Sequence, residues 1–390
     1  MLDFEKKQKN ESRVDVHSTL TVVSSTPVKP SEVHKLSVMD QSMALHSLHL
    51  VYYYRNNPGG PFDLDGLRIS LSKVLSMYPA VTGRLARDGN GDWEVNCNDA
   101  GVRVLKANVD VTLDEWLKSA DGCQERLLTA WENMPEDPAM WSPFRIQVND
   151  FVGGGLAIGL SCSHMHTDLT FAATLFQAWT MAHRHQPIGH PPSCHPFWPR
   201  ASSASSDCGT KSASRHYEVA SKQLDPTPLK MATAQFKFSD SAIKQCLAEI
   251  HFQCANATPF DLLAAIFWKS IENSNQSDVQ EKHALSVCMD FRKLLSKPLP
   301  LGYFGNAQHF SQLSVTHEEL NAANWLSHIA GMINHCTFSV TDEEIESAMN
   351  WLECQKKSDE GNSETSFRMY GSELTCISEG IVSFNLMCND

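Results

Sequence analysis

The segment Gly155-Leu-Ala-Ile-Gly-Leu-Ser-Cys-Ser163 decides the fold, and it runs directly into His164-Met-His-Thr-Asp168. Larger apolar side chains alternate along it with small ones, and this period of two predicts a β-strand. The small-residue face would let another element pack closely against it. After Asp168 the period becomes helical, with apolar or small residues at Leu169, Ala172, Ala173, Phe176, Trp179 and Thr180. The sequence therefore predicts a strand, a turn over residues 164–167, and a helix that begins near Asp168.

His164 is the candidate general base, because it lies at the corner between this strand and this helix. Reactive groups of α/β proteins tend to lie where strands end. The positive end of the following helix would disfavour a nearby imidazolium, which leaves the neutral imidazole that a general base needs. Two other interpretations stay open. A histidine beside an apolar strand is more often structural or simply exposed, and His166 is a rival base that the pattern does not select.

Asp168 has three candidate roles. It could orient His164, as the acid does in a catalytic triad. It could be a plain N-cap, which is the commoner role for an aspartate at a helix start. It could also turn away from the histidine and pair with Arg292 of the distant segment Asp290-Phe-Arg292, because an arginine–carboxylate fork is geometrically specific enough to lock the turn. We favour the third role.

The sequence offers no convincing nucleophile of its own. It has no Gly-x-Ser-x-Gly elbow, and Cys162 lies inside the predicted strand. The run Gly153-Gly-Gly155 precedes a strand rather than joining a strand to a helix, so it is not a phosphate loop. A histidine base without a nucleophile suggests direct attack by a substrate hydroxyl or amine on an activated acyl donor.

Length, charge and cysteine usage exclude several classes of protein. The 390 residues are enough for two domains or three. A net charge of −13 with scattered basic residues argues against binding nucleic acid or an anionic membrane surface. The N-terminus has no apolar core of a signal peptide, and no stretch is long enough to span a bilayer. The twelve cysteines have no Cys-x-x-Cys spacing, so we expect reduced thiols, no zinc site and a cytoplasmic protein.

Strands and helices interleave along both halves of the chain, which predicts an α/β fold. We expect strands at Leu20–Ser24, Ala234–Phe238 and Ala284–Met289, and helices at Asp63–Tyr78, at Asp240–Ile250 and after the cap Thr258. Residues 185–225 are rich in proline and then in serine, so we predict a loop or crossover there. Residues 355–365 are a second predicted loop.

Three motifs together resemble the plant BAHD acyltransferases, relatives of the chloramphenicol acetyltransferase fold. His164 and Asp168 match the family's His-x-x-x-Asp motif. Asp290 and Arg292, followed by Pro298-Leu-Pro-Leu-Gly-Tyr-Phe-Gly-Asn306, match its Asp-x-Arg segment. Tyr78-Pro-Ala-Val-Thr-Gly-Arg-Leu85 is similar to its Tyr-Pro-x-x-Gly-Arg-Leu helix exit. The resemblance covers roughly residues 35–378. The His-x-x-x-Asp motif alone is weak, but followed in this order by the Asp-x-Arg segment it is specific.

The resemblance implies a two-domain chloramphenicol acetyltransferase-like fold with mixed sheets, helices and a substrate tunnel between the domains. The domains would be residues 1–190 and 226–390, joined by a crossover loop at 191–225. It implies transfer of an acyl group, other than an aminoacyl group, from an acyl-CoA co-substrate to a hydroxyl or amine, with no permanently bound cofactor and no metal. His164 would be the base and Asp168–Arg292 the brace of the site. We expect a monomer.

The chain departs from the family pattern in three places. Leu169 replaces the usual small residue after the motif aspartate, and Leu294 replaces a second basic residue. The Asp-Phe-Gly-Trp-Gly motif is absent, and the resemblance ends at Ser378, so the C-terminal domain looks truncated.

These departures, together with Gly155 to His166, make the chain most similar to the eceriferum and glossy branch. That branch is associated with very-long-chain fatty-acid extension for cuticular wax. An alternative function is therefore that of a non-catalytic accessory protein. It would assist a fatty-acid elongase condensing enzyme at the endoplasmic reticulum surface.

Overall fold

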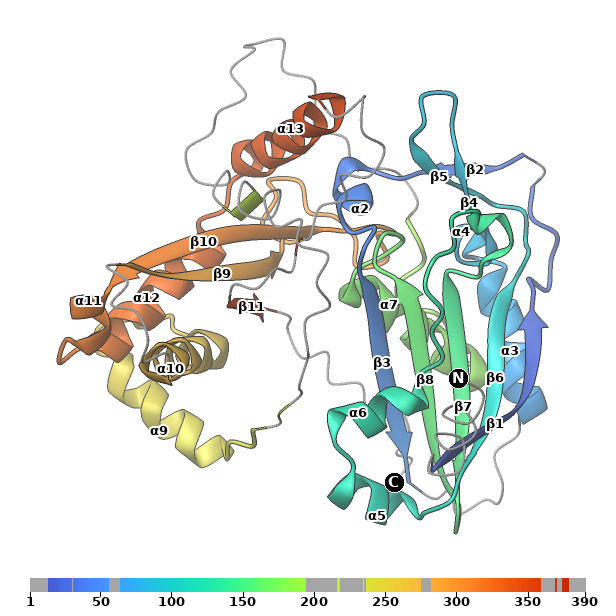
Figure 1. Cartoon of the computed structure of the whole chain (residues 1–390), viewed down its shortest axis with the longest axis horizontal. Helices are drawn as coiled ribbons and strands as arrows, with labels where there is room; N and C mark the ends of the chain where they lie inside the picture. Colours follow the sequence, from blue (N-terminus) through green and yellow to red (C-terminus); the bar gives the residue numbers. More distant parts are fainter. Residues whose placement is uncertain are drawn as a thin grey trace, which may run out of the picture.

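The computed structural model describes residues 13–29, 31–55, 64–193, 216–217, 234, 236–274, 282–358, 369 and 374–378. They form two lobes that lie side by side, each with its own β-sheet and helices (Figure 1). The N-terminal lobe holds a five-stranded sheet of order β1-β6-β7-β8-β3 and a small sheet of order β2-β5-β4. The C-terminal lobe holds a three-stranded sheet of order β10-β9-β11.

The large sheet of the N-terminal lobe is mixed, because β6 and β7 pair in parallel while its other neighbours are antiparallel. Its strands are β1 (Val14–Val22), β3 (Ser47–Tyr54), β6 (Val102–Val109), β7 (Phe144–Phe151) and β8 (Gly155–Ser163). The small sheet consists of β2 (Val33–Lys35), β4 (Arg84–Arg87) and β5 (Trp93–Asn96). The predicted strand before His164 is β8, which lies between β7 and β3 in the large sheet.

The two faces of β8 differ in the way its alternating sequence predicts. Its larger side chains, from Leu156 to Cys162, enter an apolar core with α3 (Leu64–Leu75) and α7 (Leu169–His183). On the small face, a Cβ added to Gly159 would lie 2.0 Å from the carbonyl oxygen of Leu128 in η1 (Arg126–Leu128). Only glycine permits that approach, which holds a neighbouring segment against the back of the sheet.

The remaining helices of the N-terminal lobe are short. They are α2 (Val38–Ser42), α4 (Pro79–Thr82), α5 (Leu113–Ser119), α6 (Gly122–Glu125) and η2 (Pro138–Met140). The predicted helix Asp63–Tyr78 corresponds to α3, which already ends at Leu75. Pro79 occupies the first position of α4, where a proline needs no amide hydrogen. Asp63, the first residue of the predicted helix, lies outside the described residues.

The sheet of the C-terminal lobe is built on β9 (Lys282–Asp290). It pairs antiparallel with β10 (Gln308–Thr316) and parallel with β11 (Thr375–Ser378). The helices around this sheet are α9 (Asp240–Ile250), α10 (Pro259–Ser274), α11 (His317–Asn321), α12 (Trp325–Phe338) and α13 (Asp342–Ser358). No helix among the described residues is both long and apolar enough to cross a bilayer.

Two predictions for the C-terminal half were wrong. The described residues of the predicted strand Ala234–Phe238 form no strand. Phe236 and Phe238 pack edge-on against Phe267, and no strand among the described residues pairs with them. The predicted loop at 355–365 begins later, since α13 continues to Ser358. Most of the predicted crossover at 191–225 lies outside the described residues.

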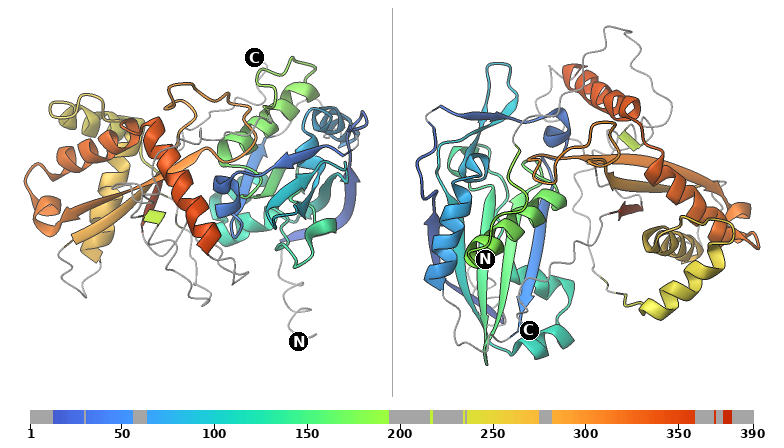
Figure 2. Two further views of the ribbon diagram at one scale, coloured as in Figure 1. Left: turned by 90° about the horizontal axis from the view of Figure 1, so that it is seen from above. Right: turned by 180° about the vertical axis from the view of Figure 1, so that it is seen from behind.

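Each lobe carries a piece of the other in its core. Val38, Met39 and Met43, in and just after α2, join the apolar core of the C-terminal lobe. Phe304, from the segment before β10, joins the core of the N-terminal lobe. Helix α13 packs against α2 across the same junction (Figure 2). The candidate site lies at this junction.

Candidate active site

His164 lies directly after β8 and is 1% exposed. Its backbone amide donates to the carbonyl oxygen of His46 at 3.0 Å. Its own carbonyl oxygen accepts from Asn306 Nδ2 at 2.8 Å and from the amide of Thr167 at 3.3 Å. Two segments distant in the sequence, at His46 and Asn306, therefore fix the backbone of this histidine together with its own turn.

Burial lowers the pKa of His164, because a charged imidazolium loses its hydration inside the protein. The Asp168 carboxylate and the Asn306 side chain act in the opposite direction but do not outweigh burial. The imidazole of His164 is therefore neutral at neutral pH. That is the protonation state in which a histidine can accept a proton.

Asp168 combines two of its three candidate roles. It is the N-cap of α7, where Oδ1 accepts from the amide of Phe171 at 3.0 Å. The same carboxylate forms a fork with Arg292, with Nη2 at 2.9 Å from Oδ1 and Nη1 at 2.8 Å from Oδ2. Oδ2 also accepts from the amide of Ala307 at 2.9 Å. Both oxygens of Asp168 are thus occupied by groups other than the ring of His164.

Arg292 is buried between two acidic partners, of which Asp168 is buried and Asp290 is partly exposed. Both Arg292 and Asp168 are 1% exposed, and Asp290 Oδ2 lies 2.9 Å from Nη1. Burial opposes the charge on the guanidinium, but Asp168 and Asp290 outweigh it and raise the pKa of Arg292. Asp290 in turn accepts from Thr170 Oγ1 at 2.7 Å, which ties the first turn of α7 to the end of β9.

Asp40 is a site residue that sequence reasoning missed. It is 2% exposed, and its Oδ1 accepts from the backbone amide of Asn306 at 2.7 Å and from Asn306 Nδ2 at 2.9 Å. Burial raises the pKa of Asp40 to about 6, although hydrogen bonds from Ser37 and Asn306 act in the opposite direction. The spacing Ser37-Val-Met-Asp40 is a capping-box signal that the sequence did contain. Its contact with Asn306 has no local signal.

His166, the rival base, lies away from these contacts. It is fully buried and meets Phe144 edge-on, with ring centroids 5.8 Å apart. Neither ring nitrogen has a hydrogen-bond partner among the described residues. Burial, with smaller contributions from His34 and Arg84, lowers its pKa to about 3. Such an imidazole is a weak proton acceptor.

The two departures from the family pattern near the site do not disturb its geometry. Leu169 is half-buried in the first turn of α7, directly after the intact cap at Asp168. Leu294 packs against the apolar core of the C-terminal lobe. Cys162 is buried in β8, and burial raises the pKa of its thiol, so it stays protonated.

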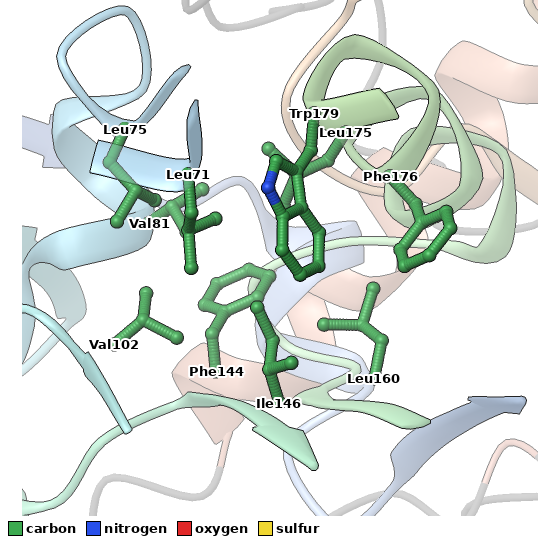
Figure 3. Close-up of a pocket in the computed structure, with 10 residues that line it drawn as sticks. All are labelled: Leu71, Leu75, Val81, Val102, Phe144, Ile146, Leu160, Leu175, Phe176 and Trp179. Atoms are coloured by element: carbon green, nitrogen blue, oxygen red, sulfur yellow. The ribbon is translucent and has the colours of Figure 1, made fainter. Parts of the chain in front are cut away.

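Neither of the following two hollows among the described residues is lined by His164. The first lies in the N-terminal core between the sheet and helices α3, α4 and α7, with ten apolar side chains around it (Figure 3). Its volume of about 10 Å³ is hardly enough for one water molecule. The second, of about 400 Å³, lies at the start of β8, beside Arg55, Thr112 and Gly153. Among the described residues, no three His, Cys, Asp or Glu side chains cluster as metal ligands.

Several known proteins are similar to this chain in sequence. The model of the Transferase family matches residues 12–385. Protein ECERIFERUM 26-like of Arabidopsis thaliana is 27% identical over 259 residues, which are 64% of this chain and 59% of that protein. Protein ECERIFERUM 2 of the same plant is 28% identical over 69% of this chain and 67% of its own length. A hydroxycinnamoyltransferase of Narcissus pseudonarcissus is 26% identical over 88% of this chain and 80% of its own length.

Solved structures share the fold. Vinorine synthase superposes with a TM-score of 0.64 at 20% identity, covering 90% of this chain and 82% of that one. TRI101 of F. sporotrichioides, solved with coenzyme A and T-2, gives 0.62 at 14% identity, covering 89% of this chain and 82% of that one. At these identities the likeness concerns the fold, and it confirms the predicted chloramphenicol acetyltransferase-like architecture of mixed sheets and helices.

Proposed function

Because this chain belongs to the Transferase family, as a plant BAHD acyltransferase close to the eceriferum branch, we propose that it transfers an acyl group from an acyl-CoA thioester to a hydroxyl or amine acceptor. His164 is the general base in this proposal. The observation that supports it most directly is the buried side chain of His164 at the end of β8, whose backbone is fixed by hydrogen bonds to His46 and Asn306. Burial lowers the pKa of its imidazole, which favours the neutral form.

The proposed reaction balances without a group from outside the two substrates and His164. His164 takes the proton from the acceptor O–H or N–H while the acceptor atom attacks the thioester carbonyl carbon. The tetrahedral intermediate then collapses, and the carbon–sulfur bond breaks. The departing sulfur takes the proton back from the imidazolium. The products are an ester or amide and free coenzyme A, and His164 is neutral again.

Asp168 and Arg292 brace the site in this proposal rather than take part in proton transfer. The fork joins the start of α7 to the segment after β9, so it fixes the turn that carries His164. Arg292 also donates through Nη2 to the carbonyl oxygens of Tyr303 and Gly305, each at 3.4 Å. The predicted substrate tunnel between the domains would have to reach His164 along this junction.

The test compares the wild type with His164→Ala. Each protein is incubated with long-chain acyl-CoA and a panel of alcohols and amines, and free coenzyme A is followed. Loss of a general base should slow release by about 10²- to 10⁴-fold. His166→Gln is the matched control and should retain release. Equal release by wild type and His164→Ala, with both proteins folded, would refute the proposed role of His164.

A second candidate function is that of a non-catalytic accessory protein in very-long-chain fatty-acid elongation. It is favoured by the similarity to two eceriferum proteins and by Leu169 and Leu294. In this case the partner would be an elongase condensing enzyme, and the cytoplasmic chain would act at the endoplasmic reticulum surface. The discriminating assay measures fatty-acid chain length in cells. Intact extension with His164→Ala, and no coenzyme A release in vitro, would establish this alternative.

A further inference from the structure

We propose that Asp40 is a positioning residue for His164, which it holds in place through Asn306. The proposal rests on the proposed function, in which His164 is the base. It concerns a carboxylate that lies far from His164 in sequence and that reaches it through a single intervening side chain.

Asn306 is the link between the two residues. One hydrogen bond from its Nδ2 goes to Asp40 Oδ1 at 2.9 Å, and the other goes to the carbonyl oxygen of His164 at 2.8 Å. The backbone amide of Asn306 also donates to Asp40 Oδ1, at 2.7 Å. Asp40 therefore fixes both the main chain and the side chain of Asn306. It thereby orients the Nδ2 group that donates to the His164 carbonyl.

The second oxygen of Asp40 anchors it to its own helix. Oδ2 accepts from the amide of Ser37 at 2.7 Å and from Ser37 Oγ at 2.6 Å. Because α2 is seated in the core of the C-terminal lobe, Asp40 is held rigidly on both sides. Four donors, none of them charged, converge on one buried carboxylate.

Gly305 shows that the chain is adapted to this contact. It has a φ of +132°, a backbone conformation that residues with a side chain rarely adopt. A Cβ there would lie 3.2 Å from Asp40 Oδ1. Glycine therefore lets the backbone turn and lets the carboxylate come close.

Asp40 and the Asp168 fork hold different parts of the site. Asp168 binds the amide of Ala307 and caps α7, on the far side of the turn from β8. Asp40, through Asn306, holds the carbonyl of His164 itself. Loss of the Asp40 contact should leave the fork intact and displace the base, so catalysis should suffer more than folding.

Asp261 supplies a matched control for the experiment. Like Asp40, it is a buried capping-box aspartate that accepts from a hydroxyl residue three positions earlier, Thr258. It also accepts from an asparagine side chain, Asn334 Nδ2, at 2.9 Å. Asp261 lies at the start of α10 and has no such link to His164. Asp40→Asn and Asp261→Asn therefore make the same chemical change at two comparable caps.

The first readout is steady-state release of coenzyme A from long-chain acyl-CoA. Asp40→Asn should lower kcat by about 10- to 100-fold, as expected for a misplaced catalytic group, while KM for acyl-CoA stays near that of wild type. Asp261→Asn should lower the melting temperature about as much as Asp40→Asn does, but it should leave kcat unchanged. If Asp40→Asn is too unstable to assay, Asn306→Ala replaces it and should show the same fall in kcat.

The second readout is hydrogen–deuterium exchange, which needs no activity. Asp40→Asn should speed exchange in the peptide covering residues 163–168, and Asp261→Asn should not. If His164→Ala abolishes release while Asp40→Asn behaves like Asp261→Asn in both readouts, the positioning role is overturned and the proposed function stands. If His164→Ala retains full release, the proposed function fails, and exchange at residues 163–168 alone decides whether Asp40 holds the turn.

Discussion

Asp40 and Asp168 bind consecutive backbone amides of one segment: Asp40 Oδ1 accepts from Asn306 at 2.7 Å, and Asp168 Oδ2 accepts from Ala307 at 2.9 Å. Both carboxylates belong to the N-terminal lobe, and the segment leads into β10 of the C-terminal lobe. Two buried acids thus set where one lobe meets the other. The two acids differ in what balances their negative charge. Asp168 is paired with the Arg292 cation, whereas the hydrogen-bond donors to Asp40 are neutral.

Replacing Arg292 by alanine should destabilise the fold strongly. Asp168 would remain buried without its cation, at a cost of about 3–5 kcal/mol in the free energy of unfolding. Urea denaturation followed by circular dichroism measures this change. Arg292→Lys keeps the charge but loses the bidentate geometry, so the stability of this variant should lie between that of wild type and that of Arg292→Ala. An unchanged midpoint for Arg292→Ala would contradict the brace.

Asp40 should give stability an unusual pH dependence. Its pKa is raised by burial from the ordinary 3.8 to about 6, so between these values the folded state binds more protons than the unfolded state. The contribution of Asp40 to stability is therefore full below pH 4 and is lost as the pH rises through 6. Relative to Asp40→Asn, the wild type should become less stable between pH 4 and pH 7, by about 3 kcal/mol. A constant difference between the two proteins would argue against the buried acid.

His166 should make the fold sensitive to acid. Burial lowers its pKa from 6.5 to about 3, so the unfolded state binds more protons and stability falls as the pH drops below 6.5. His166→Phe cannot take up a proton. The free energy of unfolding of wild type minus that of His166→Phe should therefore be about 2 kcal/mol smaller at pH 5 than at pH 7.5. Parallel pH profiles for the two proteins would mean that His166 is not shielded from water.

Gly159→Ala should disturb β8 from behind. The new methyl group would lie 2.0 Å from the carbonyl oxygen of Leu128, which is backbone and cannot swing aside. Overpacking of this kind costs about 1–3 kcal/mol, visible as a lower melting temperature. Gly89→Ala is the control, because nothing lies within 4 Å of a Cβ there. Equal melting temperatures for the two variants would show that η1 moves away freely.

Local sequence patterns predicted the strand and the helix that carry the site. They did not predict the long-range hydrogen bonds. The strand before His164 and the helix after Asp168 followed from a period of two that changes to a helical one. The residues offered three roles for Asp168, and the fork with Arg292 was favoured over the cap and over orienting His164. The cap and the fork both exist, because one carboxylate has room for several donors. The bond between Asp40 and Asn306 joins positions 266 residues apart, and no periodicity reports such a contact.

The wrong strand near Phe238 has a physical cause as well. Alternating apolar residues predict a strand only if a neighbouring strand accepts their backbone bonds. Here Phe236 and Phe238 find Phe267 of α10 instead. The alternating apolar side chains pack against a helix rather than in a sheet. Such a choice is decided by the tertiary structure rather than by the segment itself.

The exchange of core segments between the lobes limits how the molecule can move. Swinging the lobes apart as rigid bodies would pull Met39 and Met43 out of one core and Phe304 out of the other. Each withdrawal would expose a large apolar side chain at about 1.5–3 kcal/mol. Phe304 would also lose its edge-on contacts with His34 and Phe171. Wide hinge opening is therefore costly, and substrates should gain entry through rearrangement of side chains and surface loops around a fixed junction.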